Sequence, residues 1–189
     1  MGWTGTHKET GENVKTFFEG EFNSDNGQVL DCAVVNFNEA YLAYKNHNTG
    51  QIVGIVCLLH YDSNNFYNLY YKDIDEGMGP FSYNCPAKIL DQLTEPPPND
   101  WAATWREKCR QKLQNKQRNN KLKDGNVIQL SEPLEFTDGS FCDTFVITKQ
   151  KRKTLFYAAK QDGEGNWKAN PYMLYKITRW KEKDFQVIA

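Results

Sequence analysis

Three carboxylates lie close together at Asp73, Asp75 and Glu76, directly before a glycine-rich turn, Gly77-Met-Gly-Pro80. Clustered oxygen ligands suit hard cations such as Mg²⁺ or Ca²⁺, and two-metal enzymes use such acids. A calcium-binding loop would need a glutamate six residues after its glycine, where this chain has Tyr83. The sequence therefore leaves two interpretations open: a metal site completed by a ligand from elsewhere, and a structured acidic turn or partner contact.

A second group of charged residues is basic. Residues 106–123 hold eight Lys/Arg and a single acid, Glu107. Like charges at helical spacing repel by a few tenths of a kcal/mol per pair, so a helix of this kind suits an anionic surface. That surface is nucleic acid, an acidic protein or the chain's own acidic half, and a solvated helix end is the remaining alternative. The predicted partner-binding residues are Arg106, Lys108, Arg110, Lys112, Lys116, Arg118, Lys121 and Lys123.

Nucleophiles with a nearby base are absent from the sequence pattern. The three histidines are His7, His47 and His60, and Cys57 stands three residues before His60 on an expected strand, so the two point to opposite faces. Cys85 opens a helix, where the dipole would lower a thiol pKa, but no histidine is near it in sequence. No nucleotide-binding, zinc-protease or serine-hydrolase motif occurs. We expect no cofactor and no catalytic residues, although catalytic groups scattered along the chain stay open.

Charge is divided unevenly along the 189 residues. Residues 1–100 carry 5 Lys/Arg and 14 Asp/Glu, a net charge of −9, whereas residues 101–189 carry 18 and 10, a net charge of +8. Such a division indicates a partner for the basic half or neutralisation between the halves. The 14 % aromatic content favours a β-rich globular fold over disorder.

Cysteine use and hydropathy predict the compartment. The five cysteines are an odd number with no C-x-x-C pair, which is typical of free thiols in a reducing cytoplasm. The longest apolar run, Ile52–Leu59, is far shorter than the roughly 20 residues of a membrane span. Residues 1–6 formally fit a myristoylation pattern, which is short and common. We expect a cytoplasmic protein that does not bind membranes.

The first half predicts an antiparallel sheet with a packed helix. Residues 10–22 place apolar side chains at helical spacing. Four strands follow, joined by turns of hairpin length, which makes the sheet antiparallel. The expected strands are 29–37, 40–46, 51–60 and 66–72.

Two helices follow this sheet. Pro86 suits the start of a short helix over 87–93, and Pro96–Pro98 forms a stiff extended spacer. A longer helix then runs to about Asn119, and its apolar stripe covers only its first three turns, so its end should project into water. The stripe consists of Trp101, Trp105, Cys109 and Leu113.

The last third predicts a second antiparallel sheet or a small half-open barrel. Its aromatic residues do not follow the pattern of an RNA-recognition sheet, which weakens the interpretation of the chain as an RNA-binding protein. The fold class is therefore α+β: an acidic sheet region with packed helices (1–98), a basic helical bridge (99–123) and a small β module (124–189). The expected strands of the module are 127–130, 134–136, 141–148, 154–160, 172–180 and 185–188.

Several motifs resemble a family of uncharacterised proteins carried by bacteriophages and plasmids. The resemblance covers nearly the whole chain, and the triple proline and the long Lys/Gln/Asn tail depart from it. It implies an accessory or anti-defence factor that binds a host protein or nucleic acid. The motifs are Met1-Gly-Trp-Thr4, Tyr71-Lys-Asp-Ile-Asp-Glu-x-Met-Gly-Pro80, Cys85-Pro-x-x-Ile-Leu90, Trp105-Arg-x-x-Cys-Arg110 and Trp180 before Phe185-x-Val-Ile188.

We therefore expect a non-enzymatic binding protein of a phage or mobile element, which inhibits a bacterial defence system by binding a protein. The alternative is a nucleic-acid-binding accessory protein that uses the basic helix. The third interpretation is a metal-dependent enzyme that uses Asp73, Asp75 and Glu76.

Overall fold

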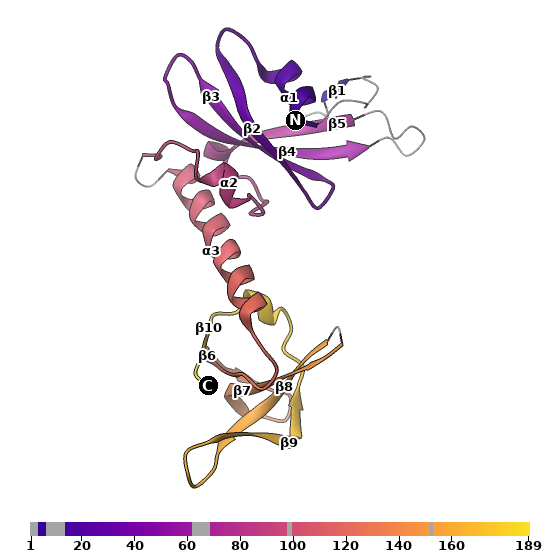
Figure 1. Ribbon diagram of the computed structural model, residues 1–189, viewed down its shortest axis with the longest axis vertical. Coiled ribbons are helices and arrows are strands. Elements are labelled where there is room, and N and C mark those ends of the chain that lie inside the picture. The colour runs from indigo at the N-terminus through magenta and orange to yellow at the C-terminus, as the bar shows by residue number, and fades with distance from the viewer. Residues whose placement is uncertain (1–3, 7–13, 62–68, 98–99, 152) are drawn as a thin grey trace. The chain divides into compact units, whose positions relative to one another are not determined.

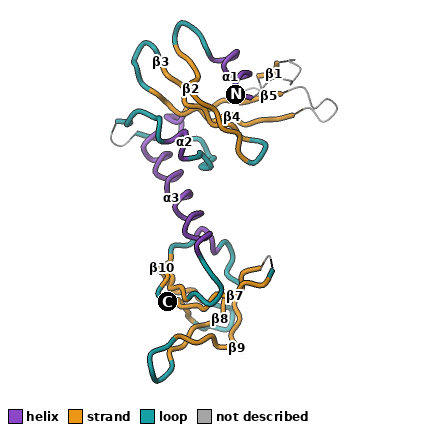
Figure 2. Tube along the Cα trace, in the orientation of Figure 1, coloured by secondary structure: helices purple, strands orange, loops and turns teal. Residues whose placement is uncertain are grey.

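The computed structural model describes residues 4–6, 14–61, 69–97, 100–151 and 153–189. The chain is α+β and divides into two compact units, Met1–Leu113 (unit 1) and Gln114–Ala189 (unit 2). Each unit contains one antiparallel sheet, and the helices are concentrated in the first two thirds of the chain (Figures 1 and 2). The division falls inside the longest helix, which contributes residues to both units.

Unit 1 is a five-stranded sheet in the order β1-β5-β4-β3-β2, with all neighbours antiparallel. The predicted sheet is thus confirmed, with an additional short strand at its β5 edge. Its elements are β1 (Thr4–Thr6), α1 (Val14–Phe22), β2 (Gly27–Val35), β3 (Glu39–Asn46), β4 (Ile52–Tyr61), β5 (Leu69–Asp75), the 3₁₀ helix η1 (Glu76–Met78), α2 (Ala87–Leu90) and the first part of α3 (Trp101–Lys121).

One face of this sheet packs against α1. Phe17 and Phe18 of α1 are buried, and both rings lie edge-on to Tyr71 of β5. Burying side chains of this size stabilises a fold by about 1.5–3 kcal/mol each. The helix predicted over 10–22 is observed from residue 14, and its predicted start lies outside the described residues.

The opposite face packs against α2 and the first turns of α3 (Figure 1). Trp105 is 1 % exposed, stacks on Tyr41 and donates its indole N–H to the carbonyl of Ser82 at 2.8 Å. Cys109 is buried one turn later. Trp101, the first residue of the predicted apolar stripe, is 69 % exposed, so the fully buried part of the stripe is Trp105 and Cys109.

The acidic stretch is mainly strand rather than turn. Asp73 and Asp75 lie on β5, and the Asp75 carboxylate accepts a hydrogen bond from the Gly77 amide at 2.7 Å, which caps η1. Gly79 then adopts φ +64, a left-handed conformation that glycine takes at little cost. Glu76, the first residue of η1, is buried. The turn is therefore a rigid junction between sheet and helices.

Unit 2 is a five-stranded antiparallel sheet in the order β10-β6-β7-β8-β9. It is an open sheet with β10 and β9 at its edges and is not closed into a barrel. Its core packs Phe145, Phe156 and Phe185 together. Besides the end of α3, its elements are β6 (Val127–Glu135), β7 (Phe141–Gln150), β8 (Lys153–Gln161), β9 (Trp167–Tyr175), the 3₁₀ helix η2 (Trp180–Glu182) and β10 (Phe185–Val187).

Two regions of unit 2 differ from their predictions. The expected strands 127–130 and 134–136 are one strand, β6, whose pairing with β7 is irregular between Gln129 and Leu134. The expected strand over 172–180 is observed as β9, Trp167–Tyr175. Its pairing with β8 is irregular between Ala169 and Leu174, where Pro171 cannot donate to a ladder. An edge strand tolerates a proline because one of its sides has no strand to pair with.

Among the helices of the described residues, none combines the length and apolar character needed to cross a membrane.

Candidate partner-binding site

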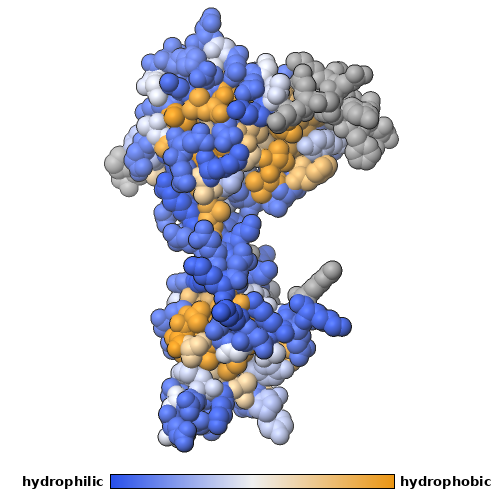
Figure 3. Space-filling model, in the orientation of Figure 1, coloured by the Kyte–Doolittle hydropathy of each residue, from blue (hydrophilic) through white to orange (hydrophobic). Residues whose placement is uncertain are grey.

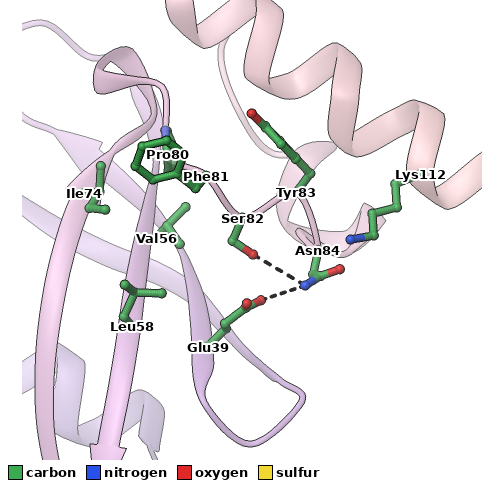
Figure 4. A pocket seen from close by; sticks show the side chains of 10 residues that line it. All are labelled: Glu39, Val56, Leu58, Ile74, Pro80, Phe81, Ser82, Tyr83, Asn84 and Lys112. Atoms are coloured by element: carbon green, nitrogen blue, oxygen red, sulfur yellow. Dashed lines mark hydrogen bonds between the residues drawn. The ribbon is translucent and has the colours of Figure 1, made fainter. Parts of the chain in front are cut away.

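Unit 1 contains a pocket of about 340 Å³ at the uncovered part of its sheet (Figure 4). Residues from β3, β4, β5, the loop between η1 and α2, and α3 surround it. We call it the Phe81 pocket. It is lined by Glu39, Val56, Leu58, Ile74, Pro80, Phe81, Ser82, Tyr83, Asn84 and Lys112.

One wall of the Phe81 pocket is apolar. Val56 of β4 and Ile74 of β5 are direct cross-strand neighbours, and Leu58 continues the same face. Pro80 is buried against this wall, whereas the next residue, Phe81, is 92 % exposed. Figure 4 shows these five side chains together on one side of the pocket. A largely exposed phenylalanine beside a concave apolar surface is a feature of binding sites.

The other wall is a polar network built around a buried tyrosine. The Tyr41 side chain is fully buried, and its hydroxyl donates to Glu39 Oε2 at 2.8 Å and lies 2.6 Å from Ser82 Oγ. The Asn84 amide group donates to the same Glu39 oxygen at 2.9 Å, and its backbone N–H donates to the Tyr41 hydroxyl at 3.1 Å. The network fixes the loop to β3 and holds the Glu39 carboxylate in one place.

This carboxylate is ionised. Burial alone would raise the pKa of Glu39, but hydrogen bonds from the network and the positive charge of Lys112 outweigh that effect, so the pKa lies below its ordinary value. Burial raises the pKa of the Tyr41 hydroxyl, which therefore stays a neutral donor. The pocket thus holds one fixed negative charge and, from an exposed residue of α3, one positive charge.

Two residues predicted to act separately are joined in the interior. Arg106 of the basic helix and Glu76 of the acidic stretch are each 2 % exposed and form a bidentate ion pair, with N–O distances of 2.7 and 2.5 Å. A third guanidinium N–H donates to the carbonyl of Thr94 at 2.5 Å. Neither side chain reaches a partner. The prediction of Arg106 as a partner-binding residue is therefore wrong, because its donors are used inside unit 1.

The remaining acids do not assemble a metal site. Asp73 is exposed on β5, and Asp75 is exposed and occupied as the cap of η1. In the part of the chain that the structure describes, no group of three or more His, Cys, Asp or Glu side chains is placed to hold a metal ion. With Glu76 committed to Arg106, the metal interpretation loses its third carboxylate.

Arg118 is also structural. Its guanidinium donates to Asp184 Oδ1 at 3.0 Å and to the carbonyls of Phe185 and Lys183 at 3.1 and 2.8 Å. The same group lies 3.8 Å from the centre of the Phe185 ring. It joins the end of α3 to the last strand within unit 2, which removes it from the predicted binding surface.

Six of the eight predicted basic residues are exposed. Lys108 lies over the Tyr83 ring, 5.1 Å from its centre, and Lys112 lines the Phe81 pocket. Figure 3 shows a hydrophilic surface where α3 runs in the middle of the view. The exposed residues are Lys108, Arg110, Lys112, Lys116, Lys121 and Lys123.

The thiols are protected rather than activated. Cys57, Cys85 and Cys109 are buried, and burial raises the pKa of each, that of Cys109 to about 12. Cys57 and His60 lie on opposite faces of β4, as the sequence predicted. His7 lies outside the described residues.

Apart from Lys112, the residues that form the pocket were not predicted as site residues from the sequence. Glu39 is a single acid at the start of a strand. One of its partners, Tyr41, is two positions away, but the other, Asn84, is 45 positions away. The available signal was the short loop Phe81-Ser-Tyr-Asn84, which places aromatic and polar residues alternately between a Gly-Pro turn and a helix start.

Comparison with known proteins gives a match in the second half of the chain. A protein-family model described as a domain of unknown function (DUF6927) matches residues 96–179, from just before α3 to just after β9. This is 84 of the 189 residues, so the likeness to an uncharacterised family holds for that segment. No curated protein and no solved structure matches the chain. Of the residues that line the Phe81 pocket, Lys112 alone lies in the matched segment.

Proposed function

We propose that this chain is a non-enzymatic binding protein that docks a protein partner at the Phe81 pocket. The observation that carries the proposal is Phe81 itself, 92 % exposed at the rim of a pocket with an apolar wall. Met78, the last residue of η1 and three positions before Phe81, is 67 % exposed. Aromatic side chains that enter a partner's surface, surrounded by polar groups, dominate the affinity of protein interfaces.

The chemistry of the pocket supports binding over catalysis. The Tyr41 hydroxyl donates to the Glu39 carboxylate, and its raised pKa keeps it neutral. A hydroxyl that holds a carboxylate in place is a positioning contact, because an activated nucleophile needs a lowered pKa or a base that accepts its proton.

The motif resemblance to phage- and plasmid-borne proteins gives this proposal its context. We propose that the protein is encoded by a phage or another mobile element and acts in the cytoplasm of a bacterial host. Its partner is a host protein, and binding inhibits a defence system of that host. The resemblance supports this context through the motifs of residues 71–80 and 105–110.

A capture experiment tests the proposal. The tagged full-length chain is incubated with bacterial host lysate, beside the Phe81→Ser variant. The control is Phe141→Ser, which removes a phenylalanine that is 69 % exposed in unit 2. We expect the wild-type chain and the Phe141 variant to retain the same specific protein and the Phe81 variant to lose it. Retention by all three chains, or by none, would refute docking at this pocket.

Nucleic-acid binding by α3 is the second candidate. It is supported by the six exposed basic residues that follow Glu107 along the helix and the loop after it. Binding of this kind weakens steeply with salt, because each neutralised phosphate releases counterions. Electrophoretic shifts with DNA and RNA at 50 and 200 mM salt test it, because six phosphate contacts would lower the affinity by about a thousandfold between the two concentrations. The absence of any shift at low salt would exclude it.

A further inference from the structure

We propose that the Phe81 pocket recognises an arginine side chain of the partner, whose guanidinium is bound by the Glu39 carboxylate. This inference rests on the proposed function, because it names the group that enters the same pocket. It follows from three properties of the pocket: a fixed charge, the sign of that charge and the shape of the walls.

The first property is the fixed position of Glu39. Its Oε2 atom accepts hydrogen bonds from the buried Tyr41 hydroxyl and from Asn84. An ionised carboxylate can accept about two hydrogen bonds at each oxygen, so Oε1 keeps the acceptor capacity for a ligand. Because the protein already holds this group in place, a ligand need not order it on binding, which favours affinity.

The second property is charge. The Glu39 carboxylate is ionised, and residues 1–113 carry 9 Lys/Arg and 15 Asp/Glu, a net charge of −6. Lys112 is the opposing charge, but it is an exposed lysine on a flexible stem, whereas Glu39 is half-buried and held by its neighbours. The fixed charge of the pocket is therefore negative, and Lys112 competes with a cationic ligand for it.

The third property is shape. The wall of Val56, Leu58 and Ile74 offers apolar contact to the methylene stem of an arginine or to an aliphatic neighbour. Phe81, 92 % exposed beside this wall, adds further contact surface for the ligand (Figure 4). Arginine fits such a site better than lysine, because its planar guanidinium presents two N–H donors side by side to Glu39 Oε1, the oxygen to which neither Tyr41 nor Asn84 donates.

The probe for this inference is the blocked dipeptide N-acetyl-leucyl-arginine amide, titrated into the ¹⁵N-labelled full-length protein. The citrulline analogue keeps the shape and removes the charge. We expect the arginine peptide to shift the amide resonances of residues 81–84, and the citrulline peptide to bind about tenfold more weakly.

Two substitutions should change the affinity in opposite directions. Glu39→Gln should weaken the arginine peptide by about tenfold, because it removes the charged acceptor. Lys112→Ala should strengthen it about two- to fivefold, because it removes the competing cation. Glu132→Gln, an exposed glutamate of unit 2, is the control and should change nothing.

The outcomes separate the possibilities. Equal binding of the citrulline peptide, or weaker arginine binding in Lys112→Ala, would overturn the inference, and the second result would assign the pocket to an anionic ligand. If Glu39→Gln does not fold, the citrulline comparison and Lys112→Ala decide, since neither alters the network. Peptide binding without Phe81-dependent capture of a protein would refute the proposed function alone. Capture without any arginine preference would refute the inference alone.

Discussion

Replacing Arg106 should destabilise unit 1 strongly. In Arg106→Met the Glu76 carboxylate stays in the interior, where it is 2 % exposed and loses both hydrogen bonds from the guanidinium. An uncompensated buried charge costs about 3–5 kcal/mol. Glu76→Leu should cost a similar amount, because it leaves the guanidinium with the Thr94 carbonyl as its remaining acceptor.

The double variant distinguishes a buried pair from simple loss of packing. With both charges removed, the remaining penalty is the Thr94 carbonyl, which loses a donor at a cost of about 1–3 kcal/mol. Arg106→Met/Glu76→Leu should therefore be more stable than either single variant. Apolar side chains of similar volume often replace a buried ion pair without loss of stability.

Urea unfolding followed by amide hydrogen exchange measures the effect in each unit. The free energy of unfolding of unit 1 is taken from the central strands β3 and β4. Amides of β7 and β8 in unit 2 provide the internal control. The ion pair does not hold α3 to the sheet if either single variant lowers the free energy of unfolding of unit 1 by less than about 1 kcal/mol. The same conclusion follows if the double variant is less stable than both single variants.

Three further predictions concern pH, backbone conformation and the hydrogen bonds of Arg118. Burial raises the thiol pKa of Cys32 to about 11 and of Cys109 to about 12, above the ordinary 9.0. The contribution of these thiols to the free energy of unfolding is complete below about pH 9 and is lost as pH rises towards 11. Urea midpoints at pH 7.5 and 10.5 measure this loss. Gly79→Ala should lower stability by about 1–2 kcal/mol, because φ is +64 and an added Cβ would lie 3.1 Å from an indole ring, and thermal unfolding measures this. Arg118→Lys should destabilise unit 2 by about 1–2 kcal/mol through loss of its three hydrogen bonds and ring contact, as measured by amide exchange in β10.

Each of these has a contrary result and a control. Stability that is unchanged from pH 7.5 to 10.5 would contradict the thiol prediction, and Cys32→Ala should reduce the slope. Gly139→Ala, at φ +77 with nothing within 4 Å of the added Cβ, isolates the backbone cost, and an equal loss at both glycines would remove the role of the indole contact. Lys121→Arg, at an exposed position on the same helix, should leave stability unchanged where Arg118→Lys lowers it.

The elements of this chain were largely predictable, because hydrophobic periodicity reports local packing. Phe17 and Phe18 at adjacent helical positions, and the spacing from Trp105 to Cys109, place α1 and α3 correctly. β9 was displaced because Asn170-Pro171 resembles a break, whereas an edge strand accommodates it.

The site was predicted less well, for a physical reason. Arg106 follows Trp105 directly and resembles its exposed basic neighbours, and only its pairing with Glu76, thirty residues away, makes it an interior residue. Similarly, Glu39 becomes a fixed charge through Tyr41, which is two positions away, and Asn84, which is 45 positions along the chain. Pairings of this kind depend on tertiary structure, which local pattern does not report.

The segment that matches a family begins within unit 1 and ends within unit 2, so it separates residues that are paired in each unit. The segment of residues 96–179 that matches a family contains Arg106 without Glu76, Arg118 without Asp184, and β6 without its neighbour β10. A gene fragment that encoded this segment alone would leave two arginines and one sheet edge unsatisfied. A chain that shares the segment therefore has to supply an acid for each arginine and a strand for that edge from the sequence on either side of it.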